Sequence, residues 1–128
     1  MNKLVIIFLA VGVSAVPSSL FAHHGNASYD ETKMVTVKGT VTAYMWQNPH
    51  VLVRVDAKND AGETVHWVME ASSTVSETAS GWNRTTFKPG DEVILEVAQL
   101  KNGNPAGRFK GGKIVINGIV FKQGVPGQ

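Results

Sequence analysis

The sequence predicts an all-β fold: a small five-stranded OB-like barrel with one short helix between its third and fourth strands. Several segments alternate apolar and polar residues with period two, which is typical of half-buried strands. One short segment between them has helical spacing instead, and a chain of 128 residues suits a single domain. The order of strands and helix is that of an OB-type barrel, with an open β-sandwich as the alternative.

Residues 1–22 have the layout of a secretory signal peptide. A basic start precedes an uncharged apolar stretch, Leu4 to Val16, and a small-residue end closes at Ala22. The apolar stretch is shorter than the roughly 20 residues that span a bilayer as a helix. Cleavage after Ala22 is favoured over cleavage after Ala15, which would truncate the apolar core. We therefore expect a periplasmic or secreted protein that begins at His23 and has no membrane segment in its mature form.

The mature domain, residues 23–128, is expected to have an ordered core at 33–122. Its predicted strands cover 34–45, 50–58, 63–71, 91–100 and 112–121. Gly39 predicts a bend or bulge in the first strand, and the QNPH turn ends that strand. The NDAG loop joins the second and third strands as a hairpin. The segments HHGNASYDETK and KQGVPGQ, at the two ends of the domain, are expected to be mobile unless other contacts hold them in place.

The predicted helix lies within residues 72–82. Thr74 and Glu77 have capping-box spacing, Val75 and Ala79 are one helical turn apart, and Gly81 stands where a helix ends. Between the last two predicted strands, the Gly-rich KNGNPAGRFKGG is interpreted as a turn.

Four histidines and no cysteine restrict any transition-metal site to nitrogen, oxygen and methionine ligands. Once residues 1–22 are removed, His23 offers both its α-amine and its imidazole to one metal ion. A further imidazole would complete a T-shaped set of three nitrogens, and His24 offers a different chelate through its own amide and ring. Both sets favour copper.

His50 and His66 are the other candidate metal ligands. By parity each lies opposite its apolar neighbours on its strand, so both are expected to point away from the core. His66 shares a side with Glu70, which could be a second ligand or a hydrogen-bonding partner of the imidazole.

A second hypothesis is a binding module whose open barrel face holds a peptide, a saccharide or a protein partner. Trp46 has the parity of the polar side and could act as a stacking platform, with Tyr44 and Arg54 beside it. Of the other two tryptophans, Trp67 is expected in the core and Trp82 at one end of the barrel.

Several function classes are disfavoured. The chain has no GxSxG, P-loop or HExxH motif, so we expect no enzymatic activity. Removing the signal peptide takes away Lys3 and lowers the formal net charge from +2 to +1, which argues against a nucleic-acid partner. A third possibility, a small structural envelope protein without a discrete site, stays open.

The mature chain resembles a family of small exported bacterial proteins that is catalogued only as a domain of unknown function. The shared features are AHH at the processing site, VKGTVTAYMWQNPH, VHWVMEAS, GWNRTTFKPGDEV and the turn-rich LKNGNPAG. The most specific are the W-x-N-P-H run, Trp46 to His50, and the G-W that precedes KPGD. The resemblance implies a secreted OB-like barrel and a functional grouping of His23, His24 and His50, but no reaction.

These observations lead to one functional expectation. The protein is predicted to be an exported periplasmic metal-binding protein, with copper as its expected cofactor and an envelope protein as a candidate partner. His23 and His50 are the preferred ligands, and His24 or His66 completes the set. The alternative is the non-enzymatic binding module.

Overall fold

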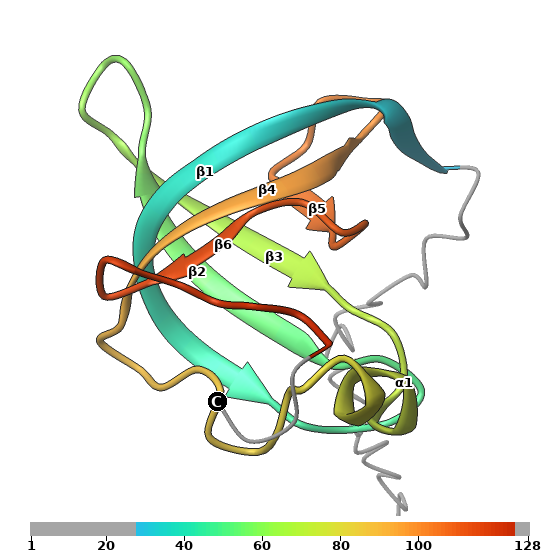
Figure 1. The fold of residues 1–128 in the computed structure, drawn as a ribbon. Helices are drawn as coiled ribbons and strands as arrows, with labels where there is room; N and C mark the ends of the chain where they lie inside the picture. The colour runs from blue at the N-terminus through green and yellow to red at the C-terminus, as the bar shows by residue number, and fades with distance from the viewer. Residues whose placement is uncertain (1–27, 125–128) are drawn as a thin grey trace, which may run out of the picture.

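A computed structural model describes residues 28–124, and it confirms the OB-like barrel (Figure 1). Its barrel strands are β1 (Tyr29–Met45), β2 (Leu52–Lys58), β3 (Thr64–Glu70), β4 (Glu92–Leu100) and β5 (Ala106–Arg108). Around the barrel they follow the order β1-β2-β3-β5-β4, and pairing of β4 with β1 closes it. The β3–β5 pair is parallel, whereas the other barrel pairs are antiparallel.

The core is built by inward-facing side chains of these strands. Val53 and Val55 of β2, and Val51 just before it, are fully buried, because alternate residues of an extended segment point to the same face. Trp82 is 2% exposed and contacts three phenylalanine rings edge-on, so it fills the core near the helix as predicted. Trp67 is half-buried and packs against the same core.

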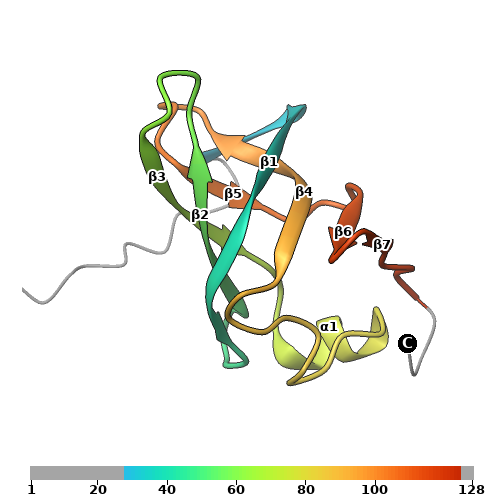
Figure 2. The same cartoon turned by 90° about the vertical axis from the view of Figure 1, so that its left-hand side faces the viewer.

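The short helix α1 (Thr74–Ala79) lies between β3 and β4 in sequence, at the end of the barrel opposite the β2–β3 loop (Figure 2). Its N-cap is Ser73, one residue before the predicted Thr74, and the buried Glu77 accepts a hydrogen bond from the Ser72 amide. Val75 is 77% exposed, so the predicted apolar face does not face the core. No helix within residues 28–124 has the length and apolar character needed to cross a bilayer.

Strand β1 begins at Tyr29, earlier than the predicted start at residue 34. The part of the terminal segment from Tyr29 onward is held in place by pairing with β4, which is the exception that the sequence prediction allowed. Tyr29 is only 3% exposed because it packs against the second, smaller apolar cluster on β4, and its backbone pairs with Leu100. Alternation failed to reveal this segment because the residues after Tyr29, "DETK", are all polar, and the last three of them are exposed.

Strand β1 has two register shifts, and neither is a bulge at Gly39: one is at Thr42 in the pairing with β2, and one lies between Tyr29 and Met34 in the pairing with β4. The register passes from Val41 opposite Val55 to Ala43 opposite Arg54, so Thr42 is the extra residue. Gly39 is required for a different reason: a Cβ there would collide with the backbone oxygen of Asp56.

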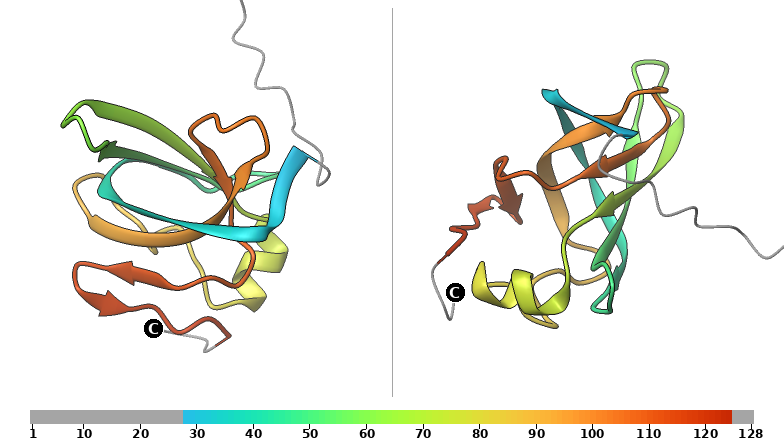
Figure 3. Two further views of the ribbon diagram at one scale, coloured as in Figure 1. Left: turned by 90° about the horizontal axis from the view of Figure 1, so that it is seen from above. Right: turned by 90° about the vertical axis from the view of Figure 1, so that its right-hand side faces the viewer.

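The last predicted strand is also corrected. Strand β5, which completes the barrel, lies in the Gly-rich segment interpreted as a turn. One glycine of this segment, Gly107, is needed by the strand itself, because a Cβ there would collide with Val97 of β4. The predicted strand at 112–121 is instead a hairpin of β6 (Ile114–Ile116) and β7 (Ile119–Val120), turning at Asn117 and Gly118. It extends the sheet from β4, beside the barrel (Figure 3).

Candidate functional site

Two of the four histidines predicted as metal ligands, His23 and His24, lie outside the described residues. His50 and His66 are described, and each has its Nδ1 atom beside a carboxylate. Between residues 28 and 124, no three His, Asp or Glu side chains gather closely enough to hold a metal ion. The described part of the chain therefore contributes histidine–carboxylate pairs and not a complete metal centre.

The first pair joins His50 to Glu70. His50 Nδ1 lies 3.0 Å from Glu70 Oε1 and 3.1 Å from the backbone oxygen of Ala71. Both partners are acceptors, so Nδ1 carries the proton in this arrangement. The side chains are 30% and 12% exposed, respectively. The imidazole is thus oriented by a carboxylate that is largely withdrawn from water.

Tyr29 and Arg108 extend this pair into a larger group, here called the His50–Glu70 cluster: Tyr29, His50, Glu70 and Arg108. The Tyr29 hydroxyl donates to Glu70 Oε2 at 3.0 Å, so the two oxygens of one carboxylate engage two different residues. The Arg108 guanidinium carbon lies 6.0 Å from the centre of the Tyr29 ring. Burial, and then the hydrogen bond and charge of Glu70, raise the pKa of Tyr29 well above its usual value, while Arg108 acts in the opposite direction. The hydroxyl therefore remains a donor.

The local fold brings the cluster together. The Asn48–Pro49 turn, which contains a cis peptide bond, places His50 directly before β2. Backbone hydrogen bonds join Val51 to Ser72 and to Ala71, which ties the start of β2 to the end of β3. The side chain of Asn48 also accepts from the amide and hydroxyl of Thr74 in α1. His50 is therefore held at a fixed point of the barrel rim.

The second pair joins His66 to Asp56 in the middle of the β2–β3 ladder. His66 Nδ1 lies 2.6 Å from Asp56 Oδ1, and the two residues are opposite one another in the strand register. The side chains are 78% and 37% exposed. Exposed pairs of this kind contribute about 0–1 kcal/mol to stability.

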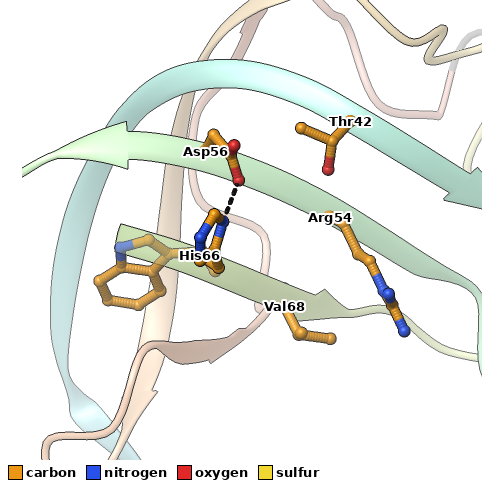
Figure 4. A pocket seen from close by; sticks show the side chains of 6 residues that line it. Thr42, Arg54, Asp56, His66 and Val68 are labelled. Carbon is orange, nitrogen blue, oxygen red and sulfur yellow. Dashed lines mark hydrogen bonds and ion pairs between the residues drawn. The ribbon is translucent and has the colours of Figure 1, made fainter. Parts of the chain in front are cut away.

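A hollow of about 300 Å³ lies on the outer face beside this second pair. Its lining residues are Thr42, Arg54, Asp56, His66, Trp67 and Val68. Figure 4 shows Val68 between His66 and Arg54, with the Arg54 side chain extending away from His66. The hollow has no second imidazole to join His66 in binding a metal.

The two histidines are too far apart to share one metal ion. Glu70, the partner of His50, is four residues beyond His66 along β3, which corresponds to about 13 Å in a strand. The predicted pairing of His66 with Glu70 is therefore wrong. Glu70 contacts His50, and His66 contacts Asp56.

The three residues predicted for a ligand-binding face do not share one surface. The extra residue Thr42 reverses which side chains of β1 point inward after Val41. Tyr44 is therefore the register partner of the buried Val53 and points to the same, inner face. Tyr44 and Trp46 are half-buried and pack against the core, and the Tyr44 hydroxyl donates to the backbone oxygen of Asn83. Arg54 alone lies on the outer face. The predicted stacking platform is therefore part of the wall of the core.

Sequence reasoning missed Tyr29, Asp56 and Arg108. Asp56 could have been found, because counting outward from the NDAG loop pairs Lys58 with Thr64 and hence Asp56 with His66. Tyr29 is 41 residues from Glu70 in sequence, and no local pattern indicates that contact.

Comparisons with known proteins identify the family but no function. No curated protein and no solved structure matched the chain. Residues 10–109 match the description "Family of unknown function (DUF6152)", a span that covers the barrel as far as the end of β5. The match includes His50, Glu70 and the other members of the His50–Glu70 cluster. The chain therefore belongs to this family of unknown function, DUF6152.

Proposed function

We propose that the protein binds a metal ion, copper by preference, through His50 together with the amine and imidazole of an N-terminal His23. The observation that carries the proposal is the contact of His50 Nδ1 with Glu70 Oε1 at 3.0 Å. Histidines that ligate metals through Nε2 commonly donate Nδ1–H to a carboxylate, which fixes the tautomer and orients the ring. His50 has this arrangement.

The chain length between His23 and Tyr29 supports the proposal. Five residues lie between His23 and Tyr29, the first residue of β1, and the six Cα–Cα steps of an extended segment reach at most about 21 Å from Tyr29. The Tyr29 hydroxyl and His50 Nδ1 lie on the two oxygens of the same carboxylate. A terminus tethered at Tyr29 is therefore within reach of His50, which lies nearer to Tyr29 than His66 does.

The donor set determines the preferred metal. The α-amine and imidazole of His23 and Nε2 of His50 are three nitrogens, and His24 offers a fourth donor from the same terminus. Nitrogen donors without thiolates suit copper, which also stands above zinc in the general order of affinities. With a chain that lacks cysteine and carries a signal-peptide pattern, we infer a periplasmic role in carrying, buffering or delivering copper.

The experiment that tests the proposal combines the N-terminus with the metal count. The protein is purified from the periplasm of an export-competent host and titrated with Cu(II), and separately with Zn(II), under native mass spectrometry. We expect a mass that begins at His23 and one tightly bound copper ion. A matched variant with one extra residue after Ala22, so that His23 is no longer terminal, should lose most of its copper affinity.

Two results would contradict the proposal. The first is a mature protein that begins at Val16, since its amine would not belong to a histidine. The second is a His23 start with no retained copper, or with copper that the N-terminal extension leaves unaffected.

A further inference from the structure

The outer face of the barrel has two adjoining hollows that the proposed metal site does not use. The first is the hollow of about 300 Å³ beside His66 and Arg54, in which Thr42 of β1 lies across from Val68 of β3 (Figure 4). The second has a volume of about 470 Å³. Asp56 lines both hollows, so they meet at the middle of β2. The two hollows together are here called the β2 trough.

The strand register brings the lining side chains of the β2 trough to one face. Asp56 is the register partner of Thr40 on β1 and of His66 on β3. Arg54 and Lys58 lie two residues before and after Asp56, so they point to the same side of β2. Four residues of a strand span about 13 Å. A ligand that contacts both Arg54 and Lys58 is therefore an extended molecule and not a single small ion.

The charges of the β2 trough favour an anionic ligand. Among the described residues that line it, three are cationic and two are carboxylates: Lys38, Arg54, Lys58, Asp56 and Glu92. Both carboxylates already accept hydrogen bonds or a close contact, since Asp56 Oδ1 lies 2.6 Å from His66 Nδ1 and Glu92 Oε1 accepts from Thr40 at 2.8 Å. The Lys58 ammonium donates to Thr64 at 2.7 Å and has two more N–H groups to offer. With His66 neutral, the lining carries a net charge of one positive unit.

The lining also distinguishes between classes of anionic ligand. A nucleic acid without paired bases stacks them on aromatic rings, whereas every aromatic side chain between residues 28 and 124 is buried or half-buried. A peptide commonly binds to a sheet by pairing its backbone with an edge strand, but the trough lies over β2, which is already paired on both sides. The hydroxyl groups of a sugar need only side-chain partners. Threonine hydroxyls, carboxylates and an imidazole can all form hydrogen bonds with them.

We propose that the β2 trough binds an acidic oligosaccharide, one whose sugar units carry carboxylates. Arg54 and Lys58 bind these carboxylates, and the guanidinium group offers the parallel N–H donors that suit a carboxylate. Asp56 contacts His66 through Oδ1 and accepts a sugar hydroxyl through Oδ2. Val68 provides an apolar contact for the C–H groups of a sugar ring. This binding is separate from the proposed metal site and needs no metal ion.

The test is a calorimetric titration with tetragalacturonate, in EDTA, of the protein purified from the periplasm. The methyl ester of the same tetrasaccharide keeps the sugar rings but lacks the negative charges, so we expect it to bind at least about tenfold more weakly. Arg54→Gln should weaken tetragalacturonate binding about tenfold, and Lys58→Gln about two- to fivefold, because exposed lysine pairs are weaker. The matched control is Lys122→Gln, which removes the same charge beyond β7, outside both hollows. Its affinity should change by less than about 1.5-fold.

A second measurement locates the bound sugar without any substitution. On addition of tetragalacturonate, the amide NMR signals of Arg54, Asp56 and His66 should shift more than those of β6 and β7. This mapping tests the proposal even if Arg54→Gln fails to fold.

Four results would overturn the proposal. They are the absence of binding, equal affinity for the acid and its ester, losses in the Arg54 and Lys58 variants no larger than in Lys122→Gln, and amide shifts confined to other parts of the barrel. Tetraglutamate that binds as tightly as tetragalacturonate would overturn the assignment to a saccharide and indicate a site for acidic peptides. Because the titration is done in EDTA, its outcome is independent of whether the protein binds copper.

Discussion

The two histidine–carboxylate pairs of the β2–β3 ladder share a contact but differ in their surroundings. His66 and Asp56 meet at 2.6 Å on an exposed face, whereas His50 and Glu70 meet at 3.0 Å with Glu70 only 12% exposed. The shorter contact belongs to the more solvated pair. Distance alone is therefore a poor guide to which pair is important for stability or function.

The difference lies in what else each carboxylate contacts. Glu70 also accepts a hydrogen bond from the Tyr29 hydroxyl, and this bond links the start of β1 to the end of β3. Asp56 is engaged only through Oδ1 in the His66 contact, and its side chain is 37% exposed. Removing a carboxylate that accepts from a buried donor lowers the stability of the fold, because the donor is left without an acceptor. At an exposed pair, water can accept the hydrogen bond instead, so less stability is lost.

The largest expected difference comes from removing the two carboxylates. Glu70→Ala leaves the buried Tyr29 hydroxyl without an acceptor and His50 without its carboxylate, so we expect a loss of about 2–3 kcal/mol in the free energy of unfolding. Asp56→Ala should cost about 0.5 kcal/mol, because both partners of that pair face solvent. Urea unfolding followed by tryptophan fluorescence measures both. Equal losses would remove the distinction between the pairs.

A smaller effect is expected when the hydroxyl of Tyr29 alone is removed. Tyr29→Phe keeps the ring against Ala98 and Leu100 but deletes one hydrogen bond to a carboxylate, which should cost about 1 kcal/mol. Thr32→Ala is the matched control, because it deletes an exposed hydroxyl-to-carboxylate bond, to Asp30, in the same strand. A Thr32→Ala loss as large as that of Tyr29→Phe would show that burial is not the deciding factor.

The smallest effect appears only in alkaline solution. The chain has two tyrosines, and burial is the main cause that raises the pKa of both above the usual value of about 10. A folded-state pKa above the unfolded value gives stability that is complete below about pH 10 and is lost as the pH rises further. Spectrophotometric titration should detect almost no tyrosinate in the folded protein near pH 10. In Tyr29→Phe the alkaline loss of stability should shrink, leaving only the part due to Tyr44.

The architecture could be predicted because its signals are local. Alternation of apolar and polar residues predicted the four longest barrel strands, and the helical spacing of the segment between β3 and β4 predicted the helix. Strand β5 escaped because the tight space around Gly107 excludes a side chain, which made a barrel strand look like a turn. One extra residue at Thr42 was sufficient to reverse the predicted orientation of Tyr44 and Trp46.

The candidate site was only half predictable. His50 was identified from its turn and its parity, and the structure adds its carboxylate partner. Tyr29 and Arg108 could not be found, because their contacts with Glu70 depend on how β1 and β5 meet the end of β3. Pairing between distant segments has no signature in a short window of sequence.

The most direct measurement of the central claim is a copper titration of two matched variants, His50→Ala and His66→Ala, in the protein beginning at His23. Each variant removes one imidazole that contacts a carboxylate, Glu70 in the case of His50 and Asp56 in the case of His66. We predict that His50→Ala lowers copper affinity by at least about 100-fold, while His66→Ala changes it by less than about twofold. Equal losses in the two variants, or an unchanged affinity in His50→Ala, would contradict the assignment of the metal site to the His50–Glu70 cluster.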